Sequence, residues 1–365
     1  MSYVIASAFL IMAFINSNSK KIFKFFMIFM FLMFAFSYMT ADWGIYLNKF
    51  YNYSSVALRS EPIFGFLNKT FNMLGFDYQQ FLIVLASFIC FLYYKIIKKY
   101  NKPGFILGLY FIFPFIMEVS QVRFACASVL VVYALLINAE EDINKNNIYK
   151  VISLIVIAGL IHYAAFLAFT YLLFNKLSKK ETVINVLIIL LVMFTINFLF
   201  SKIIYISGNS SLVNKINFVI KLNSNKNRAA IILSAFRILL FFFGYLFIYI
   251  VFLNKKKYSE SNQKIIDTVF KYNIIALLIV PLIGYSTDLY RLQQLLAIPN
   301  YISYSFFLNK ENVIHYPKKI YLRDFVFIFF CILFSFLSFY FLVLNNNNIN
   351  TVFRSFFERN LIFGR

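Results

Sequence analysis

The chain consists of long apolar runs separated by short polar connections. Because a helix needs about 20 largely apolar residues to cross a bilayer, the runs predict about twelve membrane spans, within a range of about 10 to 13. The predicted spans lie near residues 3–16, 22–39, 79–96, 104–117, 119–138, 149–161, 163–175, 182–200, 229–253, 266–284, 289–308 and 324–344. The pattern therefore predicts an all-α integral membrane protein in which residues 1–365 form a single polytopic domain, with no soluble domain.

The polar connections fall into two alternating sets that differ in their content of Lys and Arg. Six short connections, from SNSKKIFK to NKENVIHYPKKIYLR, hold 20 of the 35 cations. An excess of Lys and Arg in short loops marks the cytoplasmic side, so we expect this set inside the cell. The other set includes the long segments 40–78 and 201–228, which we expect to face outward. The protein is thus predicted to be a multi-pass protein of the inner, cytoplasmic membrane.

Composition agrees with this prediction. Hydrophobic residues make up 62% of the chain and charged residues 13%, whereas soluble domains carry about 25% charge. The net charge of +21 resides mainly in short loops, so it indicates membrane topology rather than nucleic-acid binding. We expect membrane lipids among the partners and no nucleic acid.

The sequence offers little for a metal or nucleotide. Cys90, Cys126 and Cys331 all lie in predicted spans, far apart and odd in number, which argues against disulfides and a thiolate site. The chain has only two His and contains no Walker loop, GxGxxG or HExxH motif. We therefore expect no metal and no cofactor.

The first outward segment, 40–78, is predicted to form short amphipathic helices. Asp42, Tyr46 and Lys49 are spaced so that they would share one helical face. Pro62 suits the first turn of a helix, which would place Glu61 at its N-terminus. Together these residues favour a polar site. The alternative is an amphipathic helix with solvated charges and an acid favoured by the helix dipole.

Arg123 lies at the start of a predicted span, in EVSQVRFACASVL. A charged side chain at bilayer depth costs roughly 2.5 to 3.5 kcal/mol, so an intramembrane Arg usually faces a partner, a cavity or a substrate path. Small residues beside Arg123 and Gln121 would admit another helix or a lipid headgroup. The alternative is an Arg that extends to the interface with Glu118 as its ion-pair partner.

Two further polar positions lie on the predicted outward side. His162 lies within the apolar run 149–175, which is too long for one span and predicts two short helices joined near the His. Such a His is often a hydrogen-bonded structural residue, and a catalytic role is the alternative. Asp288, Tyr290 and Arg291 open another helix, where Asp288 and Arg291 could form an ion pair.

Five motifs occur in order on this hydropathy frame: DWGIY, SEPIF, QVRFACASVL, LIHYAAFLAF and LYRLQQLLAIPNY. In this respect the chain, over roughly residues 38 to 305, resembles the EpsG-like and Wzy-type polysaccharide polymerases. The resemblance implies a GT-C-like helical fold. It also implies action on undecaprenyl-diphosphate-linked oligosaccharide in the assembly of O-antigen, capsule or exopolysaccharide, and a chain-length regulator as a further partner.

This chemistry needs cations at the membrane interface. Arg binds phosphate oxygens bidentately, so we expect Arg123, Arg291 and Arg59 to hold the diphosphate. The acceptor hydroxyl needs a general base, and the outward candidates are, in order, Glu61, Asp42 and His162. We expect supporting or sugar contacts from Gln121, Trp43, Tyr46, Asp288 and Tyr290. Trp and Tyr here could instead anchor the protein at the interface.

Other functions remain open on the sequence. An O-antigen ligase would use a similar site. A flippase or transporter of lipid-linked oligosaccharide would also need intramembrane cations, and Arg237 and Lys271 lie deep enough to favour it. However, a transporter should show cations through the depth of the bundle, and often internal repeats. The gathering of polar groups at one face favours an enzyme.

Overall fold

The computed structural model describes residues 1–52, 61–141, 145–206, 228–283, 289, 291–308, 320–344 and 349–363. These residues form helices and one isolated β-bridge. The helices are α1 (Ser2–Ile15), α2 (Lys20–Ala35), α3 (Trp43–Tyr51), α5 (Pro62–Met73), α6 (Tyr78–Ile97), α7 (Pro103–Tyr110), η1 (Phe111–Phe115), α8 (Ile116–Ser120), α9 (Val122–Glu140), α10 (Lys145–Ile161), η2 (Tyr163–Ala168), α11 (Phe169–Leu173), α12 (Lys179–Ile206), α14 (Arg228–Val251), η3 (Leu253–Lys255), α15 (Glu260–Ala276), η4 (Leu277–Leu282), α16 (Arg291–Phe307), α17 (Ile320–Phe339), η6 (Tyr340–Leu344), η7 (Ile349–Arg354) and α18 (Ser355–Glu358). The prediction of an all-α membrane protein is confirmed.

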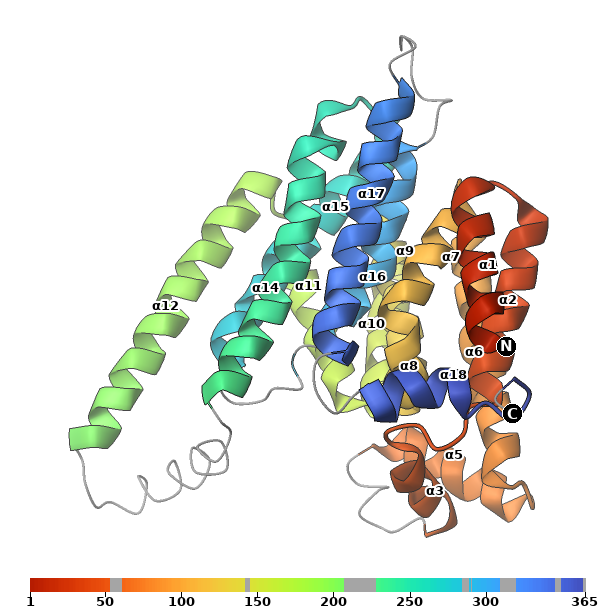
Figure 1. Cartoon of the computed structure of the whole chain (residues 1–365). Coiled ribbons are helices and arrows are strands. Elements are labelled where there is room, and N and C mark those ends of the chain that lie inside the picture. Colours follow the sequence, from red (N-terminus) through yellow and green to blue (C-terminus); the bar gives the residue numbers. More distant parts are fainter. Residues whose placement is uncertain are drawn as a thin grey trace.

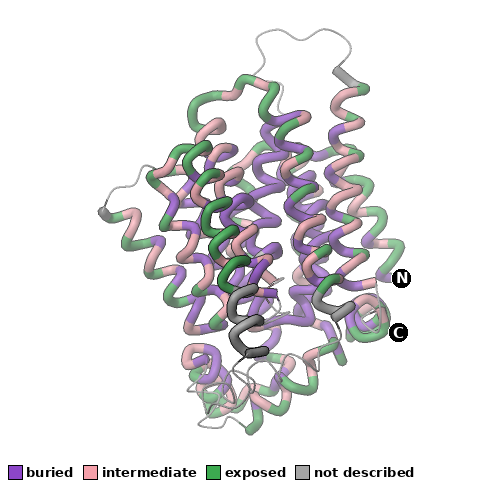
Figure 2. The backbone as a smooth tube through the Cα atoms, turned by 90° about the vertical axis from the view of Figure 1, so that its left-hand side faces the viewer, coloured by how far each residue is buried: buried purple, intermediate pink, exposed green. Residues whose placement is uncertain are grey.

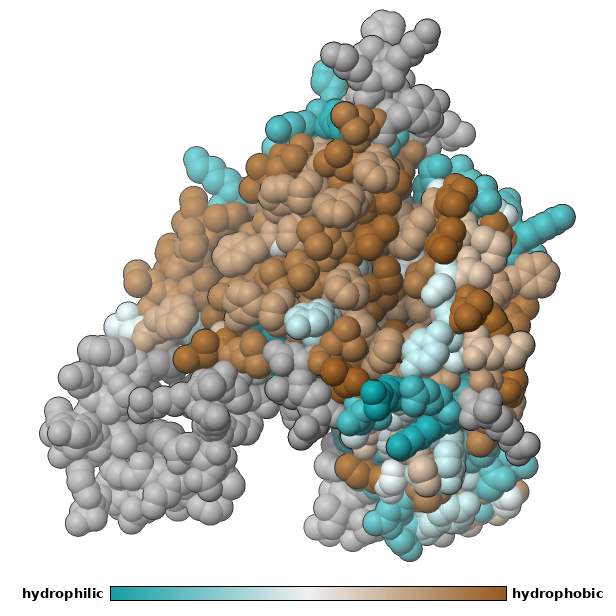
Figure 3. All heavy atoms as spheres, viewed as in Figure 1, coloured by the Kyte–Doolittle hydropathy of each residue, from teal (hydrophilic) through white to brown (hydrophobic). Residues whose placement is uncertain are grey.

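The long helices form a bundle with an apolar middle and polar ends (Figures 1 and 3). Among the described residues, six helical stretches are long and apolar enough to cross a membrane: Tyr78–Ile97, Pro103–Ser120, Val122–Glu140, Ile232–Lys255, Glu260–Leu282 and Leu322–Leu344. Three further apolar helices are shorter: Ser2–Ile15, Asn146–Ile161 and Tyr163–Leu173. Helical segments cover each predicted span, and the count of about twelve stays a prediction.

The centre of the bundle is formed by α7, η1, α8 and α9. Their residues are almost all buried, as expected for helices that are apolar on every side. Helix α9 packs against α6, α10, α15 and α16. Buried positions therefore gather in the middle of the molecule, and exposed positions lie on its outer helices (Figure 2).

Two breaks interrupt this central segment. Phe113 has an extended backbone before Pro114, consistent with the restriction that proline places on its predecessor. The Phe113 carbonyl oxygen, released from the helix, accepts a hydrogen bond from the Tyr301 hydroxyl of α16 at 2.9 Å. A second break at Gln121 separates α8 from α9. Helix α9 therefore begins inside the protein, with Arg123 in its first turn.

The described part of the segment 40–78, which was predicted to face outward, folds as predicted into short helices. Helix α3 begins after Asp42, and α5 begins at Pro62 directly after Glu61. Helix α6 follows, and its start is fixed by a capping box in which Gln80 N–H donates to Asp77 and the Asp77 N–H donates to Gln80. Helices α3 and α5 pack together at one end of the bundle (Figure 1).

The two ends of the chain meet. The Ser2 hydroxyl donates to the Phe357 carbonyl oxygen at 2.7 Å. The Asn360 side-chain amide donates to the carbonyl oxygen of Met33 at 3.1 Å, and the backbone of Asn360 bridges to Ser37. The C-terminal residues thus tie α1 to the end of α2.

Candidate active site

Four charged or titratable side chains from distant parts of the chain contact one another in series. Arg123 forms an ion pair with Glu61 through its Nη1 and the carboxylate Oε2. The other carboxylate oxygen of Glu61 lies 2.5 Å from Nδ1 of His162. Nε2 of His162 lies 3.0 Å from Nη1 of Arg291. We call these four residues the Arg-Glu-His-Arg cluster.

Each member of the cluster stands at an end of a helix. Glu61 immediately precedes α5, Arg123 is the second residue of α9, and Arg291 is the first residue of α16. His162 is the extended residue between α10 and η2, as the long apolar run predicts. The first N–H groups of a helix lack intrahelical partners, and the helix dipole makes this end positive. Three helix N-termini therefore lie near one point.

The contacts of His162 define its tautomer. Arg carries only donors, so Nη1 of Arg291 donates and Nε2 of His162 accepts. Nδ1 then carries the proton and donates to the Glu61 carboxylate. His162 is therefore neutral in this arrangement, and its basic nitrogen faces a guanidinium group.

Glu61 and His162 are buried, Arg123 and Arg291 are partly buried, and the four side chains alone sum to a positive charge. The exposed side-chain fractions are 3% for His162, 7% for Glu61 and 17% for Arg123. With His162 neutral, two guanidinium groups face one carboxylate, which gives the four side chains a charge of +1. Guanidinium groups at helix N-termini are suited to bind phosphate oxygens, so the arrangement is compatible with an anionic ligand.

Aromatic rings cover both guanidinium groups. The Cζ atom of Arg123 lies 5.2 Å from the ring centre of Tyr46 and 6.0 Å from that of Phe64. Arg291 lies 5.9 Å from the ring centre of Phe124, which also packs edge-on against His162. Of these rings, only that of Tyr46 was predicted from the sequence to lie at the site, and Phe64 and Phe124 were not. Their positions could have indicated this role, because each lies close in sequence to a predicted charged site residue. Phe64 is one helical turn after Glu61, and Phe124 directly follows Arg123.

Helix α3 forms one wall of the site. Tyr46 is buried, which raises the pKa of its hydroxyl, and burial lowers the pKa of Lys49. The charge of Asp42 opposes the second shift, so Asp42, Tyr46 and Lys49 lie within electrostatic range of one another as their spacing predicts. Trp43 packs edge-on against Tyr78, with ring centres 5.9 Å apart, and so joins α3 to α6.

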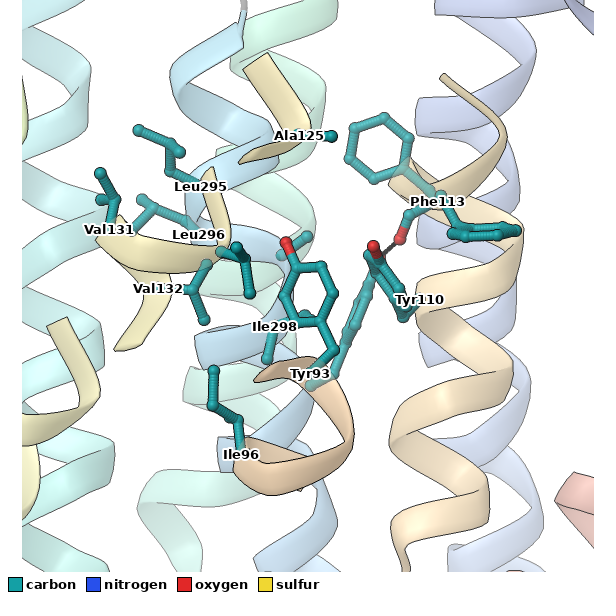
Figure 4. Packing of buried hydrophobic residues seen from close by; sticks show 14 of the residues in the cluster. Tyr93, Ile96, Tyr110, Phe113, Ala125, Val131, Val132, Leu295, Leu296 and Ile298 are labelled. Carbon is teal, nitrogen blue, oxygen red and sulfur yellow. Dashed lines mark hydrogen bonds between the residues drawn. The ribbon is translucent and has the colours of Figure 1, made fainter. Parts of the chain in front are cut away.

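The alternative partner that the sequence offered for Arg123 is wrong. Glu118 is fully buried and accepts hydrogen bonds from Ser128 at 3.0 Å and from Tyr110 at 2.5 Å, with Tyr93 at 3.4 Å. Tyr93 and Tyr110 lie in the packed interior between α6, α7 and α9 (Figure 4). Glu118 therefore links α6, α7 and α9 through hydrogen bonds, while Arg123 forms its ion pair with Glu61.

The remaining predicted residues differ in how they are placed. Gln121 is buried in the turn that starts α9, beside Arg123, where its backbone N–H donates to the Glu118 carbonyl oxygen at 2.9 Å. Arg59, Asp288 and Tyr290 lie outside the described residues, as does most of the predicted loop 201–228. Their predicted roles stay predictions.

Two glutamines that were not predicted from the sequence as site residues follow Arg291 on α16. Gln293 and Gln294 are each 1% exposed. Within the described structure, neither side-chain amide makes a hydrogen bond through its oxygen or its nitrogen. Buried amides are normally bonded, so two adjacent exceptions need an explanation. The signal in the sequence was the pair itself, two polar residues inside the apolar run 289–308.

The described residues contain no group of three or more His, Cys, Asp or Glu side chains placed to hold a metal ion. The three cysteines are buried and free, as their positions in predicted spans indicate.

Comparison with known proteins gives one result for this chain. No curated protein and no solved structure matches it. The model of the EpsG family matches residues 20–354 of the 365. The match includes all four members of the cluster and eleven of the twelve predicted spans in full. The chain therefore belongs to the EpsG family and is a multi-pass membrane protein of polysaccharide biosynthesis.

Proposed function

We propose that the protein is a polysaccharide polymerase that transfers a growing glycan from undecaprenyl diphosphate to the terminal sugar of a new lipid-linked repeat unit. Family membership supports the class of reaction. The observation that carries the proposed mechanism is the Arg-Glu-His-Arg cluster, in which two cations, a carboxylate and an imidazole meet at one end of the bundle.

Arg123 and Arg291 would hold the donor diphosphate. Each guanidinium presents a planar set of donors that matches phosphate oxygens, and the positive helix N-termini of α9 and α16 add to the attraction. The diphosphate leaves as a stable anion, so stabilising its growing charge is the main task of these groups. The scheme needs no metal ion because Arg supplies this positive charge.

His162 is the best-placed general base. When the diphosphate engages Arg291, Nε2 of His162 is released from the guanidinium and its lone pair becomes available. The acceptor hydroxyl transfers its proton to Nε2 as its oxygen forms a bond to the anomeric carbon of the donor. The bond between that carbon and the phosphate oxygen breaks, and the electron pair leaves with undecaprenyl diphosphate.

Glu61 acts in this scheme through His162 and Arg123. Its carboxylate Oε2 contacts Arg123, and its carboxylate Oε1 contacts His162. It therefore fixes the His162 tautomer and stabilises the imidazolium that forms on proton transfer, as the carboxylate of a catalytic triad does. Asp42, which the sequence ranks between Glu61 and His162 as a candidate base, acts electrostatically on Lys49 of α3. We keep Asp42 as the second candidate for the general base.

Gln293 and Gln294 are suited to contact sugar. Their unbonded amides supply donors and acceptors of the kind that sugar hydroxyl groups require, close to Arg291 on the same helix. Tyr46 and Trp43 on α3 offer aromatic rings at the same end of the bundle. We assign the Gln pair to the glycan and keep the two aromatic residues as further sugar contacts.

The site would face the outer side of the inner membrane. Helices α3 and α5 lie at one end of the bundle, and hydrophilic side chains also gather at the other end of α1 and α2, where the first lysine-rich connection lies (Figures 1 and 3). The excess of Lys and Arg in that set of connections favours the cytoplasm for it. Lipid-linked repeat units and the growing chain would thus meet outside.

In the sequence, Lys271 is an intramembrane cation that would suit a flippase. Its contacts in the structure weaken this argument. Its ammonium group donates to the carbonyl oxygens of Asn175 and Leu177, at 3.1 and 3.2 Å, in the connection after α11. Lys271 therefore stabilises a turn of the chain. An O-antigen ligase would use the same chemistry as a polymerase, and only the product distinguishes them.

The test is a reconstituted reaction. Purified protein in liposomes would receive lipid-linked repeat units, without nucleotide, metal ion or a chain-length regulator. A glycan ladder is expected, whereas a ligase would give single transfer to a different acceptor and a flippase would give no new product. His162→Asn should lower the rate by about 10² to 10⁴, the usual contribution of a general base.

The chain offers a matched control in His315, its other histidine, which lies outside the described residues. His315→Asn should leave the ladder unchanged. A full ladder from His162→Asn would remove His162 as the base while leaving the polymerase proposal standing. Absence of a ladder from the unaltered protein with several repeat units would refute the polymerase.

A further inference from the structure

A cavity at the end of the bundle away from the cluster is lined by lysines. Its volume is about 540 Å³, and it lies between the connection from α1 to α2 and the connection from α6 to α7. The described residues around it include five lysines and no carboxylate: Lys20, Lys24, Lys98, Lys99 and Lys102. Lys99 also pairs with Glu140, at 3.9 Å, just outside this cavity. Lys20, Lys24 and Lys98 give the cavity a positive wall.

The two connections that form the cavity are joined to each other. The backbone N–H of Gly104 donates to the carbonyl oxygen of Ser17 at 3.0 Å. A Cβ atom at Gly104 would lie 3.1 Å from that oxygen and 3.1 Å from the carbonyl oxygen of Ala13, so a larger residue would push the two connections slightly apart. The two connections are therefore held together, and the exposed side chains of Lys20, Lys24, Lys98 and Lys99 surround the cavity between them.

An apolar groove begins where this cavity ends. The groove has a volume of about 380 Å³ and runs between α2 and α6. Lys24 and Tyr94 line both the cavity and the groove. Beyond them the groove is lined by Met27, Ile28, Phe31, Ser87, Cys90 and Phe91.

The side chains of the groove face the membrane. Ile28 is 54% exposed and Phe91 55% exposed, on helices whose other faces are buried in the bundle. Tyr94 stacks on Phe23, with ring centres 5.5 Å apart, and forms the wall between the two spaces. A positive hollow at the interface thus continues directly into an apolar channel along the membrane.

We propose that the cavity and the groove together bind an anionic phospholipid, with its phosphate among the lysines and an acyl chain between α2 and α6. The charge of the cavity complements a phosphate, and the groove complements a hydrocarbon chain. Basic pockets between membrane helices bind lipid headgroups in this way. A soluble phosphate compound would use the cavity but would leave the groove without a function.

The test uses the full-length protein with a reporter in the groove. Phe91→Trp places an indole where the acyl chain would lie, and phospholipids brominated on their acyl chains quench it on contact. Liposomes would contain brominated phosphatidylglycerol or brominated phosphatidylcholine, and the unaltered protein corrects for Trp43. Phe336→Trp, on the exposed side of α17, is the matched reporter for general lipid contact.

The expected result is a preference for phosphatidylglycerol at the groove reporter and almost none at the α17 reporter. Lys24→Gln combined with Lys98→Gln should reduce the preference by about five-fold or more, given the usual contribution of one lysine near a membrane surface. Lys255→Gln combined with Lys257→Gln removes two exposed lysines elsewhere and should leave the preference unchanged.

Three results would overturn the proposal. The first is equal quenching by the two lipids at the groove reporter. The second is an equal loss of preference in the two double variants, which would indicate surface charge alone. The third is loss of the preference in inorganic phosphate but not in chloride of equal ionic strength, which would assign the cavity to a free phosphate compound.

Discussion

His162 and Arg291 are 129 residues apart in the chain, yet Nε2 of the imidazole lies 3.0 Å from Nη1 of the guanidinium. In the proposed mechanism, the contact keeps the basic nitrogen of His162 occupied until an anion engages Arg291. Substrate binding and base activation would then be one event, because the same diphosphate that is held by the cation also releases the imidazole. In the absence of the lipid-linked donor, Nε2 of His162 would not be available to deprotonate either an acceptor sugar or water.

Removing the charge of Glu61 should weaken both folding and activity. In Glu61→Gln the buried guanidinium of Arg123 loses its anionic partner, and breaking a buried ion pair in this way costs about 3 to 5 kcal/mol. We expect a lower melting temperature in detergent and loss of the glycan ladder. Glu260→Gln, which removes an exposed acid at the start of α15, is the control and should change neither measurement. Unaltered melting of Glu61→Gln would contradict the buried pair.

Replacing either guanidinium by an ammonium group should weaken transition-state binding. Lys retains the charge in Arg123→Lys and Arg291→Lys but cannot bind two phosphate oxygens in a planar fork. Loss of one hydrogen bond to a charged group costs about 1.5 to 3 kcal/mol, so kcat/KM for the lipid-linked donor should fall about 10- to 100-fold. Arg354→Lys, at an exposed position, is the matched control. Values within two-fold of the unaltered protein for both variants would remove the diphosphate clamp.

The glutamine pair on α16 provides a test that separates function from stability. Gln293→Leu and Gln294→Leu replace buried amides that make no hydrogen bond in the described structure, so melting temperatures should stay equal or rise. Glycan ladder formation should nevertheless fall about ten-fold, the effect of losing one or two hydrogen bonds to sugar.

The control for this test is a buried amide that is bonded. Asn273 exchanges hydrogen bonds with Asn300, at 2.7 and 3.2 Å. Asn273→Leu leaves Asn300 unpaired, which should cost about 1 to 3 kcal/mol of folding free energy. If Gln293→Leu and Gln294→Leu behaved like Asn273→Leu, losing stability and keeping activity, the pair would be structural.

Lys256 gives a prediction for the dependence of stability on pH. Burial lowers the pKa of Lys256 from its usual value of 10.5 to about 8, although its ammonium group donates to the carbonyl oxygen of Phe307 at 2.6 Å. Between pH 8 and 10.5 the unfolded chain binds more protons at this residue than the folded protein, so stability due to Lys256 rises with pH. Below pH 8 the cost of burying the charge is fully present.

Lys256→Met removes this dependence and is the comparison for the measurement. The melting temperature of the unaltered protein, relative to that of the variant, should rise as the pH increases from 8 to 10.5. Taking the difference cancels the titration of other groups. A constant difference across this range would show that Lys256 keeps its ordinary pKa.

The local features of the site could be predicted from sequence because their signals are local. Pro62 starts α5 and so places Glu61 at a helix end, and the excessive length of the run 149–175 predicts the break at His162. Arg123 was identifiable because an unexplained cation in an apolar run is costly. These arguments use only neighbouring residues.

The partners of these residues could not be predicted in the same way. Glu118 is five residues from Arg123 and was the obvious acid, whereas the actual partner, Glu61, is 62 residues away. The difference arises because, across the turn at Gln121, Glu118 contacts Tyr93, Tyr110 and Ser128 while Arg123 contacts Glu61, and these contacts depend on how distant helices pack. Pro114 accounts locally for the break at Phe113, but the group that then bonds the freed Phe113 carbonyl oxygen is the Tyr301 hydroxyl, 188 residues away.

The contact of Ser2 with Phe357 has a consequence for biosynthesis. The first helix leaves the ribosome long before its partner exists, because 355 residues separate the two. Helix α1 must therefore wait in the membrane with one end unsupported until α18 is made. Chains that stop before residue 355 would insert most of their helices but would lack the contact between α1 and α18. Quality-control proteases should recognise such chains first at the unsupported end of α1.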